Sequence, residues 1–274
     1  MKPMEFRGRW ILVTGASAGL GQAFARKLAK EHGANIVAVA RRKERLEELK
    51  QELESEAHVE VHVIAADLSK LEDVDRVIAE AQQGRQLYAA VLNAGVTYFG
   101  AYDKLSWSDF DAMLRINVVS VVRMTTELLP HLKSGAPPGG AGGGLLIVSS
   151  MAGINPVPYQ TAYSATKAFL VSFGLGMWHE LHGSNVSLTT YTPAGIATEM
   201  TAGEKFGPLR GWLAPVEQVA ECGIEAFRTR KYLAIPGAIN QVGDMLIRVL
   251  PRQFFTSQLA SVYRKALKKE LQGS

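Results

Sequence analysis

Short apolar runs alternate with amphipathic stretches along most of the chain. The apolar runs are Trp10–Val13, Ile36–Val39, Val59–Ile64, Leu87–Leu92, Leu145–Val148, Val186–Tyr191 and Tyr232–Ile235. Several are rich in β-branched residues and show no alternation, which is typical of strands buried on both faces of a parallel sheet. The stretches between them predict helices over Gly21–Glu31, Lys43–Glu54, Leu71–Gln82, Trp107–Leu132, Ala162–Leu181 and Pro215–Arg228. This alternation predicts the α/β class, with a doubly wound, Rossmann-like parallel sheet of about seven strands and flanking helices.

The alternation is interrupted in two places. Residues 135–144 hold six glycines and two prolines, which predicts a surface loop before the next strand. After Ile235, the stretches Ile239–Leu250 and Phe254–Leu271 have amphipathic helical spacing and are separated by Pro251. We therefore expect one domain over residues 1–274, with a core over 1–237 and a helical C-terminal extension over 238–274.

Composition agrees with a globular domain and excludes several other classes. Of the 274 residues, 47% are hydrophobic and 20% are charged, which allows a sizeable core. No run reaches the roughly 18 uncharged apolar residues that span a bilayer, and the segment Met1–Arg9 lacks the apolar region of a signal peptide. Cys222 is the single cysteine, so an intrachain disulfide is excluded. These features predict a cytoplasmic protein.

The net charge of +4 is concentrated at the C-terminus. Between Asp244 and Ser274 there are six basic and two acidic residues, a difference of +4, so the rest of the chain is near neutral. A nucleic-acid-binding protein would need a wider basic face, so we expect no nucleic-acid partner. The basic and apolar segment Met245–Phe255 could contact an anionic membrane surface, but packing against the protein is the favoured interpretation.

A glycine-rich turn joins the first predicted strand to the first helix. It reads Thr14-Gly15-Ala16-Ser17-Ala18-Gly19-Leu20-Gly21, so its glycines fall as G-x-x-x-G-x-G. Glycines let the backbone approach a pyrophosphate, and a helix N-terminus offers free N–H groups and the positive end of its dipole. The turn therefore predicts a nucleotide site. The expected contacts are Gly15, Ser17, Ala18, Gly19, Leu20 and Gly21.

The residues after the second strand favour NADP(H) over NAD(H). An enzyme that uses NAD usually has Asp or Glu here, which binds the ribose 2′-OH and repels a 2′-phosphate. This chain has Ala40 at that position, followed by Arg41 and Arg42. A guanidinium binds phosphate through parallel charge-assisted hydrogen bonds. Positive charge at a helix start also opposes the helix dipole unless an anion lies nearby, although a solvated helix start is the simpler alternative.

A third group of residues suggests proton transfer. Tyr163 and Lys167 are four residues apart, which puts both on one face of a helix. A free tyrosine has a pKa near ~10, and a neighbouring ammonium favours the phenolate and lowers that pKa. Ser150 lies thirteen residues before Tyr163, directly after a predicted strand. Its hydroxyl can donate to a carbonyl oxygen that becomes negative during hydride transfer.

Together these motifs resemble the classical short-chain dehydrogenase/reductase family over Arg9 to Thr198. The family pattern combines T-G-x-x-x-G-x-G with a serine followed by Y-x-x-x-K. The resemblance implies an oxidoreductase in which Tyr163 is the general acid/base and Lys167 also binds the nicotinamide ribose. It further implies that Asn117 is a fourth catalytic residue, which supports a water linking the lysine to solvent.

The resemblance also implies further cofactor contacts. Asp67 and Leu68 match the family position beside the adenine, and Asn93-Ala94-Gly95 matches the N-A-G motif. The segment that starts at Thr192-Pro193 resembles P-G-x-x-x-T, with Ala194 where the family has glycine. Its expected contacts are Pro193, Ile196 and Thr198. We expect no catalytic metal, because His179 and His182 lack the spacing of H-E-x-x-H.

The substrate is expected to be an apolar ketone or aldehyde. Met151, Ile154, Tyr98 and Met200 are the predicted substrate contacts, with Phe99, Pro156 and the rest of 200–208 nearby. The alternatives are a 3-oxoacyl thioester of lipid metabolism, a steroid-like or other lipid ketone, and a xenobiotic carbonyl. A sensor that binds NADP(H) without turnover is the alternative from another class. By family resemblance, the long helices Trp107–Leu132 and Ala162–Leu181 are expected to form a homodimer or homotetramer.

Overall fold

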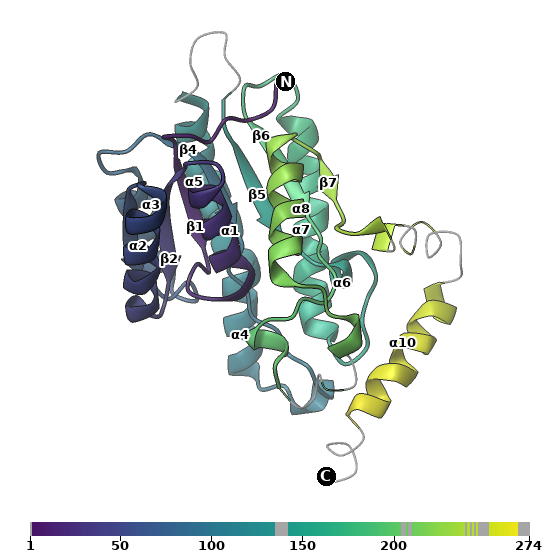
Figure 1. Cartoon of the computed structure of the whole chain (residues 1–274). Coiled ribbons are helices and arrows are strands. Elements are labelled where there is room, and N and C mark those ends of the chain that lie inside the picture. The colour runs from purple at the N-terminus through teal and green to yellow at the C-terminus, as the bar shows by residue number, and fades with distance from the viewer. Residues whose placement is uncertain are drawn as a thin grey trace.

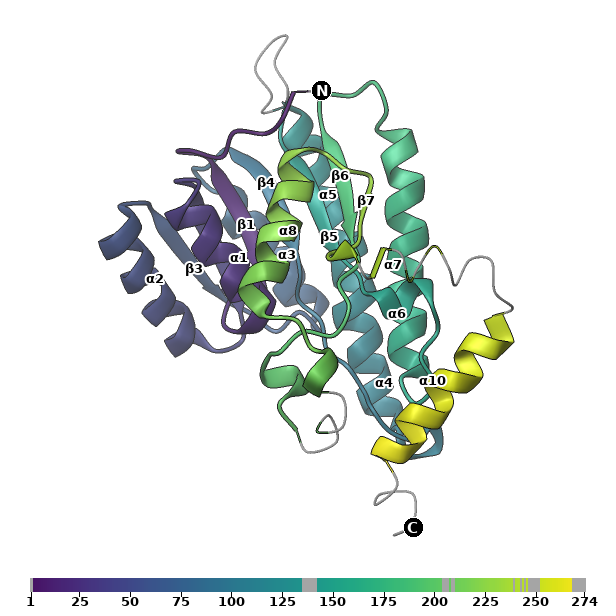
Figure 2. The same ribbon diagram turned by 45° about the vertical axis from the view of Figure 1, so that its right-hand side comes forward.

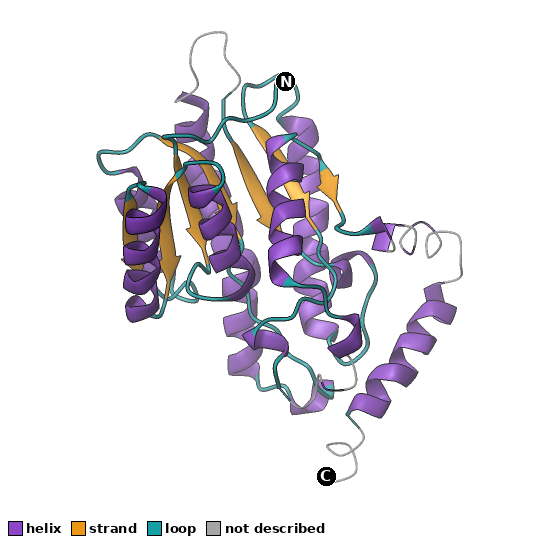
Figure 3. Cartoon of the chain, in the orientation of Figure 1, coloured by secondary structure: helices purple, strands orange, loops and turns teal. Residues whose placement is uncertain are grey.

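Seven strands pair in one sheet in the order β3-β2-β1-β4-β5-β6-β7, and every pairing between them is parallel (Figures 1 and 3). The strands are β1 (Trp10–Thr14), β2 (Asn35–Ala40), β3 (Val61–Ala65), β4 (Leu87–Leu92), β5 (Gly144–Val148), β6 (Ser187–Tyr191) and β7 (Leu233–Ala234). The predicted doubly wound parallel sheet is therefore confirmed. The third strand begins two residues later than predicted, and the last has only two residues.

The structure is a computed structural model that describes residues 2–134, 142–203, 207, 210–238, 240, 241, 243, 245 and 252–267, without the side chains of Arg252, Phe254 and Phe255. Most of the predicted glycine-rich loop, and most of the predicted helix Ile239–Leu250, lie outside these residues. The same holds for part of the predicted substrate segment 200–208.

Two helical layers cover the sheet. The first holds α1 (Gly19–Lys30), α2 (Lys43–Ala57) and α8 (Val216–Arg228), and the second holds α3 (Leu71–Gln82), α5 (Ser120–Ser134) and α7 (Thr161–Glu180). One core cluster packs the first layer on the sheet, with Phe24, Leu46 and Phe227 fully buried. The other packs the second layer, with Val77, Leu128 and Leu170 fully buried. Because both faces of the sheet are covered, its central strands can be apolar throughout.

The predicted helix Trp107–Leu132 is not uniform. It consists of α4 (Trp107–Leu114), a π-helical turn over Arg115–Val119, and α5. A π-helical turn displaces the helix by one extra residue per turn, and such turns often occur at functional sites. Here the turn contains Asn117.

The chain leaves β1 toward β2 on one side and enters β4 on the other, so the two halves of the sheet diverge between β1 and β4. At such a point the loops after the strands open a crevice at the carboxyl ends. Two short helices occur in the segments that follow β4 and β5, the 3₁₀ turn Tyr102–Lys104 and α6 (Met151–Ile154). The topology therefore predicts where a ligand binds before any side chain is considered.

The C-terminal extension contributes α10 (Arg252–Ala266), which lies at the end of the sheet toward which the strands point (Figures 1 and 2). Leu267, directly after α10, is 2% exposed and packs with the buried Phe99 and with Tyr159. The extension thus folds back onto the core. In the part of the chain that the structure describes, no helix is long and apolar enough to cross a membrane.

Candidate active site

A cavity of about 1280 Å³ opens at the carboxyl ends of the strands. The loops after β1, β2, β3, β4, β5 and β6 all contribute to its wall. Every predicted cofactor residue except Gly21 lines this cavity. The topology therefore brings together motifs that are spread over 184 residues, from Gly15 to Thr198.

The glycine turn after β1 is tightly packed against the loop after β4. Gly15 has a φ of +72°, which favours glycine, and a Cβ on Gly21 would lie 2.3 Å from the Gly15 carbonyl oxygen. Thr14 Oγ1 accepts hydrogen bonds from the N–H groups of Asn93 and Ala94 at 2.9 and 3.0 Å. Gly21 therefore does not line the cavity, but its missing side chain allows the first turn of α1 to pack against the Gly15 backbone.

This turn fits the phosphates of a dinucleotide. A Cβ at Gly15 or Gly21 would clash with Asn93 or with the turn itself, so glycine at both positions lets the turn and the N-terminus of α1 take this compact form beside the cavity. Ser17, Ala18, Gly19 and Leu20 line that part of the wall. The residues present therefore fit the nucleotide that the sequence predicts.

Arginines lie at the rim of the cavity after β2. Arg42 Nη2 donates to Ser17 Oγ at 3.3 Å, and Arg42 Nη1 pairs with Glu199 Oε2 at 3.0 Å. Arg45 pairs with the other oxygen of Glu199. Hydrogen bonds from Arg45 and Arg42 hold the pKa of the Glu199 carboxyl below its usual value. Arg41 lines the cavity too, and it has no side-chain hydrogen bond to any described residue.

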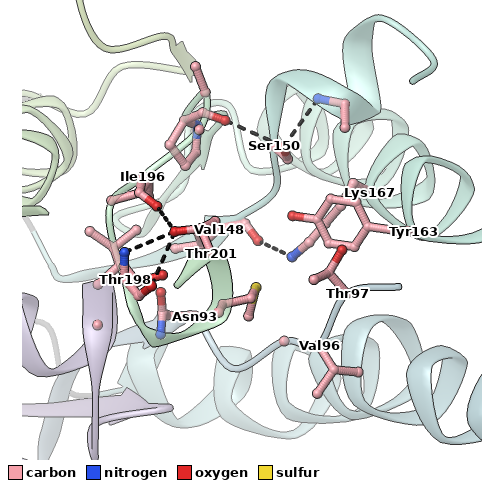
Figure 4. A pocket seen from close by; sticks show the side chains of 18 of the residues that line it. Asn93, Val96, Thr97, Val148, Ser150, Tyr163, Lys167, Ile196, Thr198 and Thr201 are labelled. Atoms are coloured by element: carbon pink, nitrogen blue, oxygen red, sulfur yellow. Dashed lines mark hydrogen bonds between the residues drawn. The ribbon is translucent and has the colours of Figure 1, made fainter. Parts of the chain in front are cut away.

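Ser150, Tyr163 and Lys167 meet on the wall formed by α6 and α7 (Figure 4). Ser150 caps the N-terminus of α6, where its Oγ accepts the Ala152 N–H at 3.1 Å and makes a long 3.4 Å contact to the Pro193 carbonyl oxygen. Lys167 Nζ donates to the Val148 carbonyl oxygen at 2.9 Å and lies 5.8 Å from the centre of the Tyr163 ring. The helical spacing therefore does place the phenol and the ammonium on one side of α7.

Burial shifts both groups of this pair. It raises the pKa of Tyr163 above its usual value of 10, and a hydrogen bond with Ser150 offsets part of that rise. Burial also lowers the pKa of Lys167 to about 8. We expected the ammonium to lower the pKa of Tyr163, but in the chain alone burial is the largest influence and raises that pKa. The phenol therefore keeps its proton at neutral pH, which is the form that a proton donor needs.

Asn117 lies behind the cavity wall, where it is fully buried. Its Oδ1 accepts the Val96 N–H at 2.9 Å, and its Nδ2 donates to the Val96 carbonyl oxygen and to Thr166 Oγ1. A Cβ on Gly95 would lie 3.2 Å from Asn117 Oδ1 and 3.4 Å from Lys167 Nζ. Asn117 thus holds the loop after β4, and Gly95 keeps a small space open between the amide oxygen and the ammonium.

The predicted substrate contacts divide into two groups. Met151 and Met200 line the cavity, whereas Ile154 and Tyr98 do not. The Tyr98 hydroxyl donates to the Ala101 carbonyl oxygen at 2.9 Å, within its own loop. Ile154 ends the short helix α6, and it is the next residue, Asn155, that reaches the wall. Sequence spacing does not reveal which side of so short a helix faces a cavity.

Several lining residues were not predicted. Among them are Val96, Thr97, Asn155, Val157, Gln160, Glu199, Trp212, Leu213, Leu259 and Tyr263. Leu259, Tyr263 and Leu267 follow one another at intervals of four, so this stripe could have identified the packed face of α10. The side-chain oxygen of Thr97 and the amide nitrogen of Asn155 are buried without a hydrogen-bond partner in the structure.

Two other expectations concern the loop after β6 and metals. Ala194 replaces the family glycine without strain, because its φ is not positive, and it still lines the cavity. Among the described residues, no group of three or more His, Cys, Asp or Glu side chains is placed to hold a metal ion.

Comparison with known proteins agrees with this geometry. A family model for short chain dehydrogenases matches residues 9–206. The chain is 33% identical over 198 residues to the very-long-chain 3-oxoacyl-CoA reductase of Anas platyrhynchos, a match that covers 71% of this chain and 62% of that protein. It is 30% identical over 275 residues to the very-long-chain 3-oxoacyl-CoA reductase-B of Danio rerio, covering 97% of this chain and 85% of that protein.

A solved 7beta-hydroxysteroid dehydrogenase is similar in fold. It superimposes with a TM-score of 0.81 at 24% identity, over 94% of this chain and 99% of that chain. The family match covers the segment that carries both the glycine turn and the Tyr163–Lys167 pair. The chain therefore belongs to the short-chain dehydrogenase/reductase family.

Proposed function

We propose that this protein is an NADP(H)-dependent oxidoreductase that interconverts a ketone or aldehyde and the corresponding alcohol. One observation carries the proposal. The wall that holds Ser150, Tyr163 and Lys167 is continuous with the glycine turn in a single cavity. A dinucleotide bound with its phosphates at the turn can therefore reach Tyr163 with its nicotinamide end.

When bound, the cofactor would supply or accept the hydride at the substrate carbon, and residues of this chain would bind the substrate oxygen and transfer the proton. The contact that Ser150 Oγ donates to the Pro193 carbonyl oxygen is long, at 3.4 Å, so this hydroxyl can turn to donate to the substrate oxygen instead. Tyr163 donates the proton during reduction, since burial keeps its phenol protonated. Lys167 holds the ribose of the cofactor and connects the phenol to the space beside Asn117 and Gly95.

Charge at the cavity rim supports the choice of NADP(H). Ala40 offers no carboxylate for a ribose 2′-OH, and the Arg41 guanidinium next to it is free of side-chain partners among the described residues. A guanidinium binds a phosphate through charge-assisted hydrogen bonds. We therefore assign Arg41 and Arg42 to the 2′-phosphate.

We propose a long-chain 3-oxoacyl thioester as the substrate. The cavity is large, and apolar side chains such as Val157, Leu213 and Leu259 form part of its wall. Such a lining suits an acyl chain. The relatives named as 3-oxoacyl-CoA reductases support the same class.

Substitution of Tyr163 by Phe tests the chemistry. Because Phe removes the proton donor and keeps the ring, kcat should fall by about 10²- to 10⁴-fold, while the Kd for NADPH stays within about twofold. Consumption of NADPH followed by absorbance, and quenching of protein fluorescence, give the two values. Tyr102→Phe, at an exposed tyrosine outside the cavity, is the matched control. Unchanged turnover in Tyr163→Phe would remove the assignment.

A panel of ketones tests the substrate class. With NADPH, kcat/KM should rise with chain length among 3-oxoacyl-CoA substrates and exceed the value for a steroid ketone. Faster reduction of the steroid would reassign the substrate. If the wild type binds NADPH but reduces no carbonyl, the sensor alternative holds.

We also propose a cytoplasmic homodimer or homotetramer. Val119 and Phe169 are exposed apolar residues next to α5 and on α7, the helices expected at the interface. Light scattering of the purified protein measures the oligomeric mass, and a monomer would exclude this part of the proposal.

A further inference from the structure

A carboxylate of this chain lies among the arginines at the cavity rim. Glu199 pairs with Arg42 at 3.0 Å and with Arg45, and all of the contacts are between side chains. Glu199, Arg41, Arg42 and Ser17 all line the cavity, and Arg42 contacts both Glu199 and Ser17. This is the place where the 2′-phosphate of the proposed cofactor is expected to bind.

The contacts of Glu199 resemble those that a phosphate would make. Its two oxygens accept hydrogen bonds from two different guanidinium groups, those of Arg42 and Arg45. The Arg42 guanidinium also donates to the Ser17 hydroxyl at 3.3 Å. Two arginines, Arg42 and Arg45, contact this one carboxylate, so positive charge remains in excess. A phosphate monoester carries nearly two negative charges at neutral pH and would balance this excess better than a carboxylate.

The side chain of Glu199 can leave without disturbing its backbone. Thr198 and Thr201 form a capping box around the 3₁₀ turn Glu199–Thr201, and Thr201 Oγ1 also donates to the Ile196 carbonyl oxygen at 2.6 Å. These bonds hold the turn independently of the ion pairs. The Glu199 side chain is 57% exposed, and ion pairs at that exposure stabilise a protein little.

We propose that the Glu199 carboxylate occupies the 2′-phosphate subsite in place of a phosphate. NADP(H) must displace this carboxylate to bind, whereas NAD(H), which has no 2′-phosphate, need not. Glu199 thereby weakens the binding of NADP(H) and reduces the preference of the protein for NADP(H) over NAD(H). This inference rests on the proposed cofactor preference. A rival role is that the Glu199 carboxylate accepts hydrogen bonds from the ribose 2′-OH of NAD(H), as an acidic residue after β2 does in enzymes that use NAD.

Glu199→Gln tests the inference because it removes the charge and keeps the shape. The control is Glu48→Gln, which removes the same charge from an exposed position on α2 that does not line the cavity. Isothermal titration calorimetry gives the Kd for NADPH and NADH. Adenosine 2′,5′-bisphosphate and 5′-AMP serve as probes of the adenosine half alone.

Glu199→Gln should bind NADPH and adenosine 2′,5′-bisphosphate about three- to tenfold more tightly than the wild type. Its Kd for NADH and 5′-AMP, and every Kd of Glu48→Gln, should stay within about twofold of the wild type.

Three outcomes overturn the inference. Unchanged or weaker NADPH binding by Glu199→Gln shows that the carboxylate does not compete with the 2′-phosphate. Weaker NADH binding establishes the rival role. A wild type that binds NADH more tightly than NADPH refutes the proposed cofactor itself, whereas failure of this inference alone leaves the NADPH preference of the wild type intact.

Discussion

Burial decides the chemistry of single residues in this cavity. Spacing places Tyr163 and Lys167 on one face of a helix, but it does not give their pKa values. Desolvation disfavours both charged forms, the phenolate and the ammonium. It therefore raises the pKa of Tyr163 and lowers the pKa of Lys167. The pair is therefore neutral over a wider pH range than the same two residues on a surface helix.

The low pKa of Lys167 predicts a pH-dependent stability. Its usual pKa of 10.5 applies to the unfolded chain and a pKa of about 8 to the folded chain, so between these values the unfolded state binds more protons. The free energy of unfolding of the wild type should therefore rise relative to Lys167→Met as pH increases through this window. The rise should be about 3 kcal/mol at most.

Denaturant titrations of both proteins from pH 7 to pH 10 measure this difference. The variant serves as the reference in which all other groups titrate alike. A difference that stays constant with pH would show that Lys167 keeps its ordinary pKa in the folded protein.

At the scale of elements, the helices do more than pack on the sheet. The π-helical turn between α4 and α5 directs Asn117 toward the loop after β4, which a regular helix over the same residues would not be expected to do. In α7, glycine lets the helix approach β6. A Cβ on Gly174 would lie 2.1 Å from Thr190 Oγ1, whereas a Cβ on Gly176 would meet nothing within 4 Å.

These two glycines give a matched pair of substitutions on one helix. Gly174→Ala should destabilise the protein by about 1–3 kcal/mol, because the methyl group forces α7 away from β6. Gly176→Ala should instead stabilise it by about 0.5–1 kcal/mol, because alanine favours the helix and the position is open. Chemical denaturation measures both changes. Equal effects would mean that α7 is not held at this distance from the sheet.

At the scale of the whole molecule, the C-terminal extension completes the cavity. Leu259 and Tyr263 of α10 reach the wall, and Leu267 and Tyr263 pack against Phe99, with the Phe99 and Tyr263 rings 5.3 Å apart. Arg264 Nε also donates to the Tyr159 hydroxyl at 3.1 Å. This part of the cavity wall thus depends on a segment beyond the family match at 9–206.

Leu267→Asp should detach α10, because a carboxylate cannot remain buried beside Phe99 without a partner. We expect the KM for a long-chain substrate to rise by about tenfold and the Kd for NADPH to stay within about twofold. Ser261→Asp, on the exposed side of α10, is the control. An unchanged KM in Leu267→Asp would show that α10 is not part of the substrate site.

The sequence by itself determined the sheet class, the glycine turn and the Tyr163–Lys167 face. These features depend on periodicity and backbone constraints that act over a few neighbouring residues. Only the tertiary structure joined Glu199 to Arg42, 157 positions away, and α10 to Phe99. It also excluded Tyr98 and Ile154 from the cavity wall and reversed the expected pKa shift of Tyr163. Desolvation and long-range pairing depend on which residues the whole fold places around a side chain. The spacing of neighbouring residues in the sequence therefore cannot predict them.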